Sequence, residues 1–285
     1  MLPRICRRLL FPVLERSFTY DAYERLLDRL ADEQRFKVVP LREFSSTRSE
    51  SRAVIALRHD VDHRLDSALE MARLEHERGL PATYFVLHTA RYWAGRDLVP
   101  NLLKLQDGHG HEVGWHNDLV TLECVYGGDA RAFLGDQLER LRAAGIRIEG
   151  SASHGSPYCY RFGYHNNYFF SDFDGEEQPG FPNSQVVETQ RGRCRIPKGR
   201  LADFGFLYEA YHLDHDLYYS DASFDERGLR WHADRLDFDT LFSGKRAIIL
   251  VHPCHWDASA AAKVRRLPAE IGRAVNPGRP VGGAE

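Results

Sequence analysis

The chain has 285 residues, 43% of them hydrophobic and 28% charged, with a formal net charge of −3 at pH 7. This balance is ordinary for a folded globular protein and lacks the basic excess of a general nucleic-acid binder. No run approaches the roughly 18 apolar residues that span a bilayer, so we expect no stable membrane insertion. The five cysteines are scattered without a Cys-x-x-Cys spacing, which favours free thiols and a cytoplasmic protein.

The chain length fits one large domain better than two. The first 15 residues are basic and then apolar, but a proline and a glutamate interrupt the apolar run and no small-residue cleavage site follows. We therefore expect an N-terminal extension over 1–18, a single domain over 19–275 and a flexible tail, rich in proline and glycine, over 276–285.

Helix and strand patterns alternate along the chain. Apolar residues at helical spacing predict helices over 21–31, 65–77, 98–105 and 130–143. Short apolar or β-branched runs predict strands over 53–57, 83–87, 112–116, 146–151 and 247–251. The aromatic-rich region 155–245 breaks the rhythm and predicts loops with irregular strands. The alternation indicates an α/β fold with a parallel strand core and crossover helices.

Two carboxylates follow the strand predicted over 53–57. Asp60 and Asp62 are two residues apart, so in an extended chain their side chains point the same way. Ionised carboxylates this close repel each other. They require either a positive partner, such as Arg58, Arg64 or a helix N-terminus, or a divalent cation.

Histidines end several of the other predicted strands. His116, His154 and His252 each lie at or just past a short apolar or β-prone run. Strand ends that all carry ionisable or metal-binding residues are most simply explained by one shared site, as in barrels of alternating strands and helices. One Asp with two His is a common ligand set for a hydrolytic metal ion. Alternation along 112–116 puts His111 on the opposite face from His116, which favours a structural role for His111.

The motifs in their order resemble a known family. They read Arg-His-Asp-Val-Asp at 58–62, Gly-His-Glu-Val-Gly-Trp-His at 110–116, Ser-His-Gly-Ser-Pro at 153–157 and Val-His-Pro-Cys-His-Trp at 251–256. This set is similar to the polysaccharide deacetylase (NodB-homology, carbohydrate esterase family 4) group, in particular a subgroup found with O-antigen and other surface-glycan genes. The resemblance spans roughly residues 19 to 257.

The resemblance implies a distorted (β/α)7-type barrel with long loop insertions. It also implies a metal-dependent hydrolase that removes an acetyl or formyl group from the nitrogen of an amino sugar. The expected cofactor is a divalent cation, zinc first, with nickel or cobalt as alternatives. A cytoplasmic protein would act on a nucleotide-linked or lipid-linked glycan precursor.

By this resemblance Asp62 and His116 are metal ligands, although Asp62 could instead cap the helix that begins near residue 65. The family usually places a second histidine four residues after the first, and that position is Val120 here. Asp118 and His154 are the available replacements. We favour His154, because it ends the next predicted strand, and keep Asp118 as a residue behind the site.

The remaining roles concern proton transfer. Asp60 is the expected general base, and His252 the general acid that protonates the leaving nitrogen. Asp221 is expected to orient His252 in its charged form. His63 and His255 flank these positions, where they would contact substrate or simply pack against neighbours.

Two other readings stay open. The chain could be a non-catalytic carbohydrate-binding relative, which valine at position 120 favours, or a hydrolase of another non-peptide C–N bond. A pure binder has no need of Asp60, Asp62 and His252 together, which favours the enzyme.

Overall fold

The computed structural model describes residues 18–49, 51–222, 236, 238, 240–241 and 244–266. Nearly all of the predicted N-terminal extension, the tail over 276–285 and Cys6 lie outside these residues. The chain divides into two compact units, which are described separately. The first comprises Met1–Thr83, His109–His111 and Asp214–Arg279, and the second comprises Tyr84–Gly108, Glu112–Leu213 and Pro280–Glu285.

An eight-stranded sheet has the order β8-β5-β4-β3-β2-β10-β9, with β1 paired to β2. Its strands are β1 Phe36–Val39, β2 Ala53–Val61, β3 Ala82–Leu87, β4 Glu112–Asn117, β5 Ile148–Ser153, β8 Tyr208–Glu209, β9 Leu217–Ser220 and β10 Arg246–Val251. The pairs β1–β2, β2–β10, β10–β9, β4–β5 and β5–β8 are all parallel. This mostly parallel sheet with surrounding helices confirms the predicted α/β class and the parallel core of a distorted barrel.

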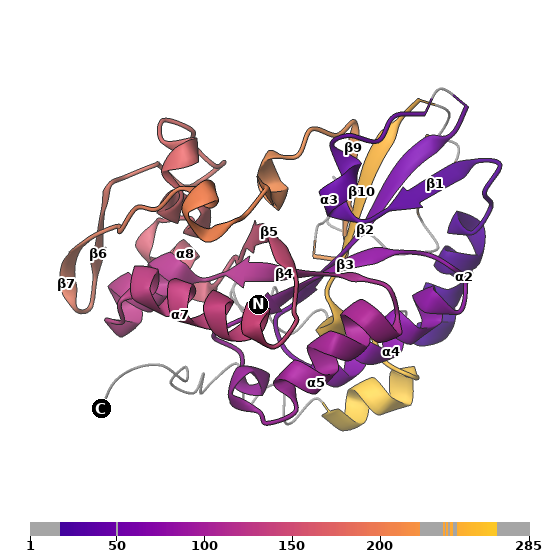
Figure 1. Ribbon diagram of the computed structural model, residues 1–285, viewed down its shortest axis with the longest axis horizontal. Helices are drawn as coiled ribbons and strands as arrows, with labels where there is room; N and C mark the ends of the chain where they lie inside the picture. The colour runs from indigo at the N-terminus through magenta and orange to yellow at the C-terminus, as the bar shows by residue number, and fades with distance from the viewer. Residues whose placement is uncertain are drawn as a thin grey trace, which may run out of the picture. The chain divides into compact units, whose positions relative to one another are not determined.

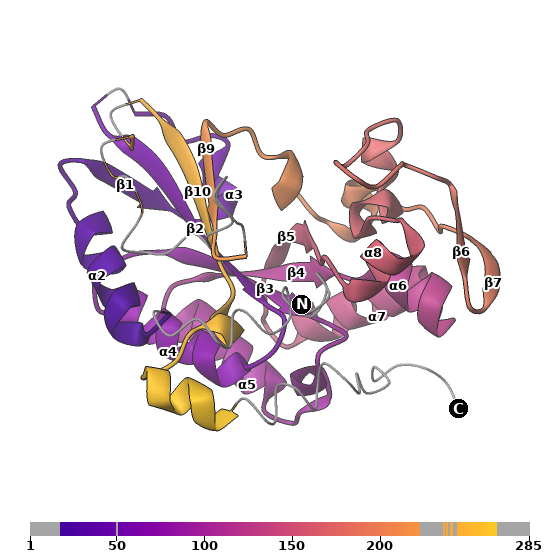
Figure 2. The same cartoon turned by 180° about the vertical axis from the view of Figure 1, so that it is seen from behind.

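In the first unit, β2 is buried at all nine of its positions, as expected for a parallel strand covered on both faces. Its helices are α2 Tyr20–Leu30, α3 Leu41–Phe44 and α4 Leu65–His76. Figures 1 and 2 show α2 and α4 side by side along the strands of this unit. The Thr19 hydroxyl caps α2 by accepting from the Ala22 amide at 3.3 Å, and the apolar stripe of the helix is buried.

The second unit places helices around β4 and β5. They are α5 Leu98–Leu103, the π-turns η2 Lys104–Gly108 and η3 Leu122–Tyr126, α6 Leu119–Thr121, α7 Ala130–Ala143 and α8 Pro157–Phe162. The predicted irregular region contains short 3₁₀ turns, at Asn166–Phe169, Ser171–Phe173, Leu201–Phe204 and Ala210–His212. It also contains an antiparallel hairpin, formed by β6 Val186–Thr189 and β7 Gly192–Arg195.

The predicted element boundaries hold to within a few residues, with two informative differences. The strand predicted over 53–57 continues to Val61, so Asp60 belongs to the strand itself. The strand predicted over 146–151 occupies 148–153 instead. Ile146 is used to close the turn after α7, where its amide donates to the Leu141 carbonyl at 3.0 Å, and this places His154 directly after the strand.

Every helix among the described residues is too short or too polar to cross a bilayer.

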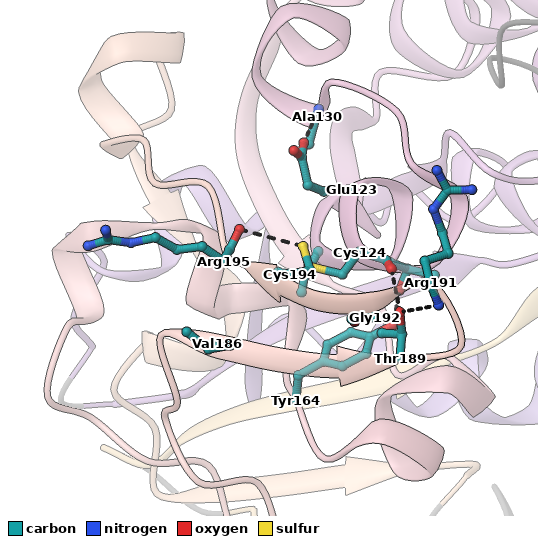
Figure 3. Close-up of a disulfide and its surroundings, with 12 residues drawn as sticks. Glu123, Cys124, Ala130, Tyr164, Val186, Thr189, Arg191, Gly192, Cys194 and Arg195 are labelled. Atoms are coloured by element: carbon teal, nitrogen blue, oxygen red, sulfur yellow. Dashed lines mark hydrogen bonds between the residues drawn. A yellow bond between two sulfur atoms is a disulfide. The ribbon is translucent and has the colours of Figure 1, made fainter.

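The expectation of free thiols is wrong for two of the cysteines. Cys124 of η3 and Cys194 of β7 form a disulfide across 70 residues of sequence, with Cα atoms 5.4 Å apart (Figure 3). The hairpin lies against η3 here, since the Thr189 hydroxyl donates to the Cys124 carbonyl at 2.9 Å. The disulfide could not be predicted from the sequence, because the spacing of cysteines along the chain does not show which segments pack against each other. With two cysteines in a disulfide, the cysteines no longer favour a reducing compartment. Cys159 and Cys254 are not part of a disulfide.

Candidate active site

The end of β2 holds a buried ion pair. The Arg58 guanidinium donates to Asp60 through Nε to Oδ1 and through Nη2 to Oδ2, each at 2.8 Å. Such a bidentate contact fixes both the charge and the orientation of a carboxylate. Arg64, the other candidate partner, instead donates to Asp66 at 2.9 Å. Arg58 is thus the positive partner that the Asp60 carboxylate requires.

The opposite face of β2 carries a structural network. His59 Nε2 lies 2.6 Å from Glu75 Oε1, and the Tyr23 hydroxyl donates to the same oxygen. Burial opposes ionisation of Glu75, but His59 outweighs it and lowers the pKa of this carboxyl. His111 is buried, and both of its ring nitrogens hydrogen-bond to backbone groups of β3 and α4. These contacts are what a structural role for His111 requires.

A second carboxylate–histidine pair lies at the ends of β9 and β10, which are paired in parallel. Asp221 Oδ1 is 2.6 Å from His252 Nδ1, and its Oδ2 accepts from the His252 amide at 2.8 Å and from Trp256 Nε1 at 2.9 Å. Burial disfavours a charged His252, yet Asp221, with Asp62 and Asp60, raises its pKa to about 9. The predicted orientation of His252 by Asp221 therefore has the geometry it needs.

His255, from the 3₁₀ turn η9 Pro253–His255, joins this pair. Its Nδ1 lies 3.1 Å from Asp221 Oδ2. Together these histidines hold the pKa of the buried Asp221 carboxyl well below its usual value, against the effect of burial. His63, by contrast, is exposed.

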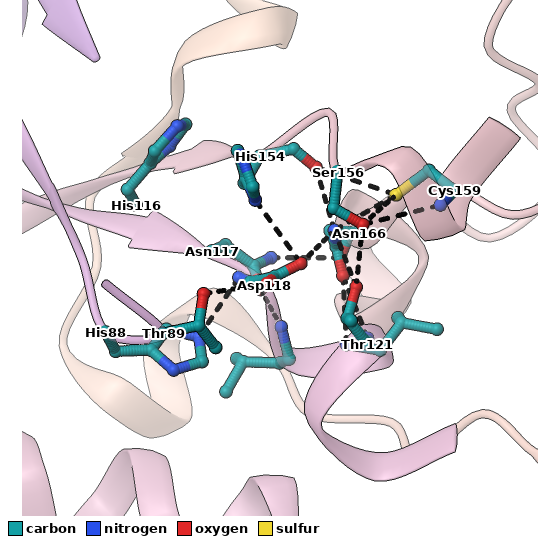
Figure 4. A network of polar contacts seen from close by, with 12 residues as sticks. His88, Thr89, His116, Asn117, Asp118, Thr121, His154, Ser156, Cys159 and Asn166 are labelled. Carbon is teal, nitrogen blue, oxygen red and sulfur yellow. Dashed lines mark hydrogen bonds and ion pairs between the residues drawn. The ribbon is translucent and has the colours of Figure 1, made fainter. Parts of the chain in front are cut away.

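The second unit brings His116 and His154 together. Their ring centroids are 5.1 Å apart. His116 Nδ1 hydrogen-bonds to the Ala152 carbonyl at 2.7 Å, while His154 Nδ1 faces Asp118 Oδ1 at 3.5 Å (Figure 4). Because His116 Nδ1 is hydrogen-bonded and His154 Nδ1 faces the Asp118 carboxylate, Nε2 is the atom that each histidine can offer to a metal ion. A carboxylate or carbonyl behind a ligating imidazole is the usual arrangement in metal sites.

Asp118 is buried, with both oxygens engaged. Oδ2 accepts from the Thr89 hydroxyl at 2.9 Å and Oδ1 from Asn166 Nδ2 at 3.0 Å. Burial alone would raise the pKa of the Asp118 carboxyl, but His154, His88 and Thr121 together outweigh burial and lower it. These contacts fix Asp118 next to His154, with its Oδ1 3.5 Å from His154 Nδ1.

Sequence reasoning missed Asn166, which joins the ends of β4 and β5. Its Nδ2 also donates to the His154 carbonyl at 2.8 Å, and its Oδ1 accepts from the amides of Val120 and Thr121 at 3.1 and 3.2 Å (Figure 4). Position 120, where the family usually has a ligand, is instead a buried residue of α6. The only signal for Asn166 was its place in an aromatic-rich cluster, which carries no spacing rule.

Asp60, Asp62, Asp221, His252 and His255 thus belong to the first unit, and His116, Asp118 and His154 to the second. Asp62 directly follows β2 and is half-buried.

No protein-family model and no curated protein matches this chain. It is similar to the solved structure of a family 4 carbohydrate esterase from Bacillus anthracis, with 14% identity, 88% of this chain and 86% of that chain covered, and a TM-score of 0.36. It is also similar to the chitin deacetylase from the fungal pathogen Colletotrichum lindemuthianum, with 16% identity, 81% and 86% coverage and a TM-score of 0.38. A third is a Streptococcus mutans CE4 esterase, with 11% identity, 93% and 90% coverage and a TM-score of 0.36. At such identities and TM-scores, these likenesses assign neither an activity nor a metal to this chain.

Proposed function

We propose that the protein is a metal-dependent hydrolase that removes an N-acyl group, acetyl or formyl, from an amino sugar. The observation that carries the proposal is the His116–His154 pair, in which His116 Nδ1 is hydrogen-bonded to the Ala152 carbonyl and His154 Nδ1 faces the Asp118 carboxylate at 3.5 Å, so that each ring has Nε2 to offer an ion. Asp62 is the proposed third ligand. One carboxylate and two imidazoles suit zinc, nickel or cobalt and leave coordination positions for water and substrate.

Two features support this choice of ligands. Asp62 follows β2, His116 lies on β4 and His154 follows β5, so all three are at carboxyl ends of strands of one mostly parallel sheet. Ligands and catalytic groups collect at that edge in folds of this class. Asp118 is the weaker candidate, since Thr89 and Asn166 already occupy its oxygens.

A bound divalent cation would supply the acidity of the attacking water and polarise the acyl carbonyl. Asp60, fixed by Arg58, is oriented to take the proton of that water. An amide nitrogen cannot leave as an anion and must be protonated. His252 is protonated near neutral pH because its pKa is about 9, so it can donate this proton, while Asp221 holds the ring in place.

The finer assignments come from the motif resemblance. We propose a substrate from surface-polysaccharide or O-antigen biosynthesis, with the acyl sugar on a glycan or its precursor. A cytoplasmic site of action would suit a nucleotide-linked or lipid-linked precursor, but the Cys124–Cys194 bond weighs against that compartment.

Metal analysis tests the ligand set. Purified protein should contain about one zinc, nickel or cobalt ion per chain, as a three-ligand hydrolytic site does. Asp62→Ala and His154→Ala should each lose that ion, because two remaining protein ligands bind weakly. Asp66→Ala is the matched control, since Asp66 is exposed and pairs with Arg64. Full metal content in both ligand variants would contradict the proposed site.

Turnover tests the chemistry. A panel of N-acetyl and N-formyl amino sugars, free and as nucleotide conjugates, should include a substrate from which acetate or formate is released. Asp60→Asn should keep the metal and lose about 10²–10⁴-fold in kcat, the usual contribution of a general base. Metal-free protein that binds glycans without turnover would support the non-catalytic reading. Opening of a cyclic amide to the corresponding amino acid, but no acid released from sugars, would indicate another C–N hydrolase.

A further inference from the structure

The Asp221 carboxylate contacts two histidines. Its Oδ1 is 2.6 Å from His252 Nδ1, and its Oδ2 is 3.1 Å from His255 Nδ1. The two imidazole centroids are 4.9 Å apart. A carboxylate that only oriented a general acid would need one such partner. The proposed reaction gives the second histidine, His255, no role.

The geometry points to His255 as a positioning residue for proton transfer. We propose that His255, by sharing the Asp221 carboxylate with His252, limits how strongly His252 holds its proton. The use of this effect in catalysis rests on the proposed function, while the effect itself is a property of the three side chains.

Both plausible states of the His255 ring act in the same direction. A neutral ring with its proton on Nδ1 presents that proton to the carboxylate at the 3.1 Å contact distance and draws negative charge away from His252. A protonated ring does the same and also repels a protonated His252. The remaining tautomer would direct a lone pair at the carboxylate, which is unfavourable. In either favourable state, His255 lowers the proton affinity of His252.

The other charged and titratable groups facing this cluster cannot replace His255. Asp60 and Asp62 act on His252 in the opposite sense and raise its pKa. Among the neighbouring groups, Tyr23 interacts electrostatically with Asp221, and Lys263 lies over the Phe18 ring that stacks on His255. Asp257 lies 3.9 Å from Arg64. Arg58 is paired with Asp60, and Arg64 donates to the Trp256 carbonyl and to Asp66.

A metal ion is the competing occupant of this cluster, since the possible ligand atoms of Asp221, His252 and His255 lie within 4.8 Å of one another. Three donors already satisfy Asp221 in addition to His255, namely the His252 ring, the His252 amide and the Trp256 indole. A cation would have to displace these hydrogen bonds and a proton that His252 retains at neutral pH. The contacts therefore favour a proton site.

The consequence for the reaction is a better-matched acid. A general acid works best when its pKa is near the working pH, because it must be protonated and still release the proton readily. A buried histidine held by one fully charged carboxylate, with two more carboxylates nearby, would bind its proton too tightly. His255 offsets part of that attraction.

Histidine titration by NMR tests the proposal without a substrate. The pKa of His252 is measured in the full chain with isotope-labelled histidine, and its resonance is assigned by its loss in His252→Gln. In His255→Gln and His255→Ala we expect this pKa to rise. If His255 is charged, like charges 4.9 Å apart predict a rise of roughly 0.6 to 2.5 pH units for effective dielectric constants of 80 to 20. His76→Gln is the matched control, because His76 is an exposed histidine of α4 in the same unit.

A His252 pKa that is unchanged or lower in both His255 variants, in protein that unfolds cooperatively like the wild type, would overturn the proposal. An equal rise in His76→Gln would overturn it as well. If a substrate is found, the basic limb of the pH–rate profile should move upward by the same amount in His255→Gln. If the proposed function is wrong, no substrate will be turned over, but the pKa of His252 will still rise in the His255 variants.

Discussion

Replacing Asp221 by Asn should remove a pH-dependent part of the protein's stability. The substitution keeps the shape of the side chain and removes its charge. Against the effect of burial, Asp221, with smaller contributions from Asp62 and Asp60, raises the pKa of His252 from 6.5 to about 9. A shift of 2.5 units corresponds to about 3 kcal/mol of unfolding free energy. The His252 side chain is only 13% exposed, so solvent screening does not greatly reduce this value.

The sign follows from proton linkage. Because the folded state binds the His252 proton more tightly, the stabilisation is fully present below pH 6.5 and is lost as the pH rises through about 9. Asp221→Asn removes the largest of the effects that raise the pKa of His252, so this pKa falls and only Asp62 and Asp60 still oppose burial. The difference in unfolding free energy between wild type and variant should therefore shrink by up to about 3 kcal/mol between about pH 6 and pH 10.

Urea denaturation of both proteins at several pH values measures this difference. Titrating groups away from Asp221 contribute equally to both proteins and cancel, while His255, 3.1 Å from Asp221, adds to the difference in the same direction. A difference that stays constant across the range would refute the assignment of a charged His252 held by Asp221, whatever the size of the pH-independent loss.

Three further substitutions test other parts of the structure. Replacing Cys124 and Cys194 by Ser opens a loop of 70 residues and should lower the unfolding free energy by about 4 kcal/mol. If the wild type is equally stable with and without a reductant, the disulfide is not present. Arg58→Met leaves the buried Asp60 carboxylate unpaired and should cost about 3–5 kcal/mol in denaturation experiments, with partial recovery when Asp60→Asn is added. Gly150→Ala puts a Cβ 2.2 Å from a tyrosine ring of β8 and should lower the unfolding free energy by about 1–3 kcal/mol, whereas an unchanged melting temperature would show that the ring moves freely.

Local sequence patterns were sufficient to predict the main elements of the fold. Apolar periodicity located α2, α4 and α7, and the short apolar runs located β2 to β5 and β10, because each signal arises within one element. The parallel arrangement of the sheet could be predicted because strands and helices alternate along the chain. The 3₁₀ turns and the β6–β7 hairpin were not predicted, since their conformations depend on contacts such as the Cys124–Cys194 bond rather than on a local period.

In the candidate site, too, local patterns located some residues, whereas the partners of those residues depend on contacts between distant segments. Asp60, His116, His154 and His252 could be picked out because each lies at the end of a strand with a strong apolar signal. Their partners could not. Arg58 and Arg64 were equally plausible from the sequence, and only the side-chain directions show that Arg58 holds Asp60.

Asp118 shows why a ligand cannot be chosen from spacing alone. Its place two residues after His116 made it an acceptable third ligand, and its chemistry fits a metal as well as an imidazole does. In the proposed site we prefer His154, because the oxygens of Asp118 already accept hydrogen bonds from Thr89 and Asn166 and face His154. A carboxylate that must orient a neighbouring histidine loses those contacts if it turns to bind the ion itself. Asn166, which is distant in sequence, thereby supports the choice of His154 rather than Asp118 as the proposed ligand.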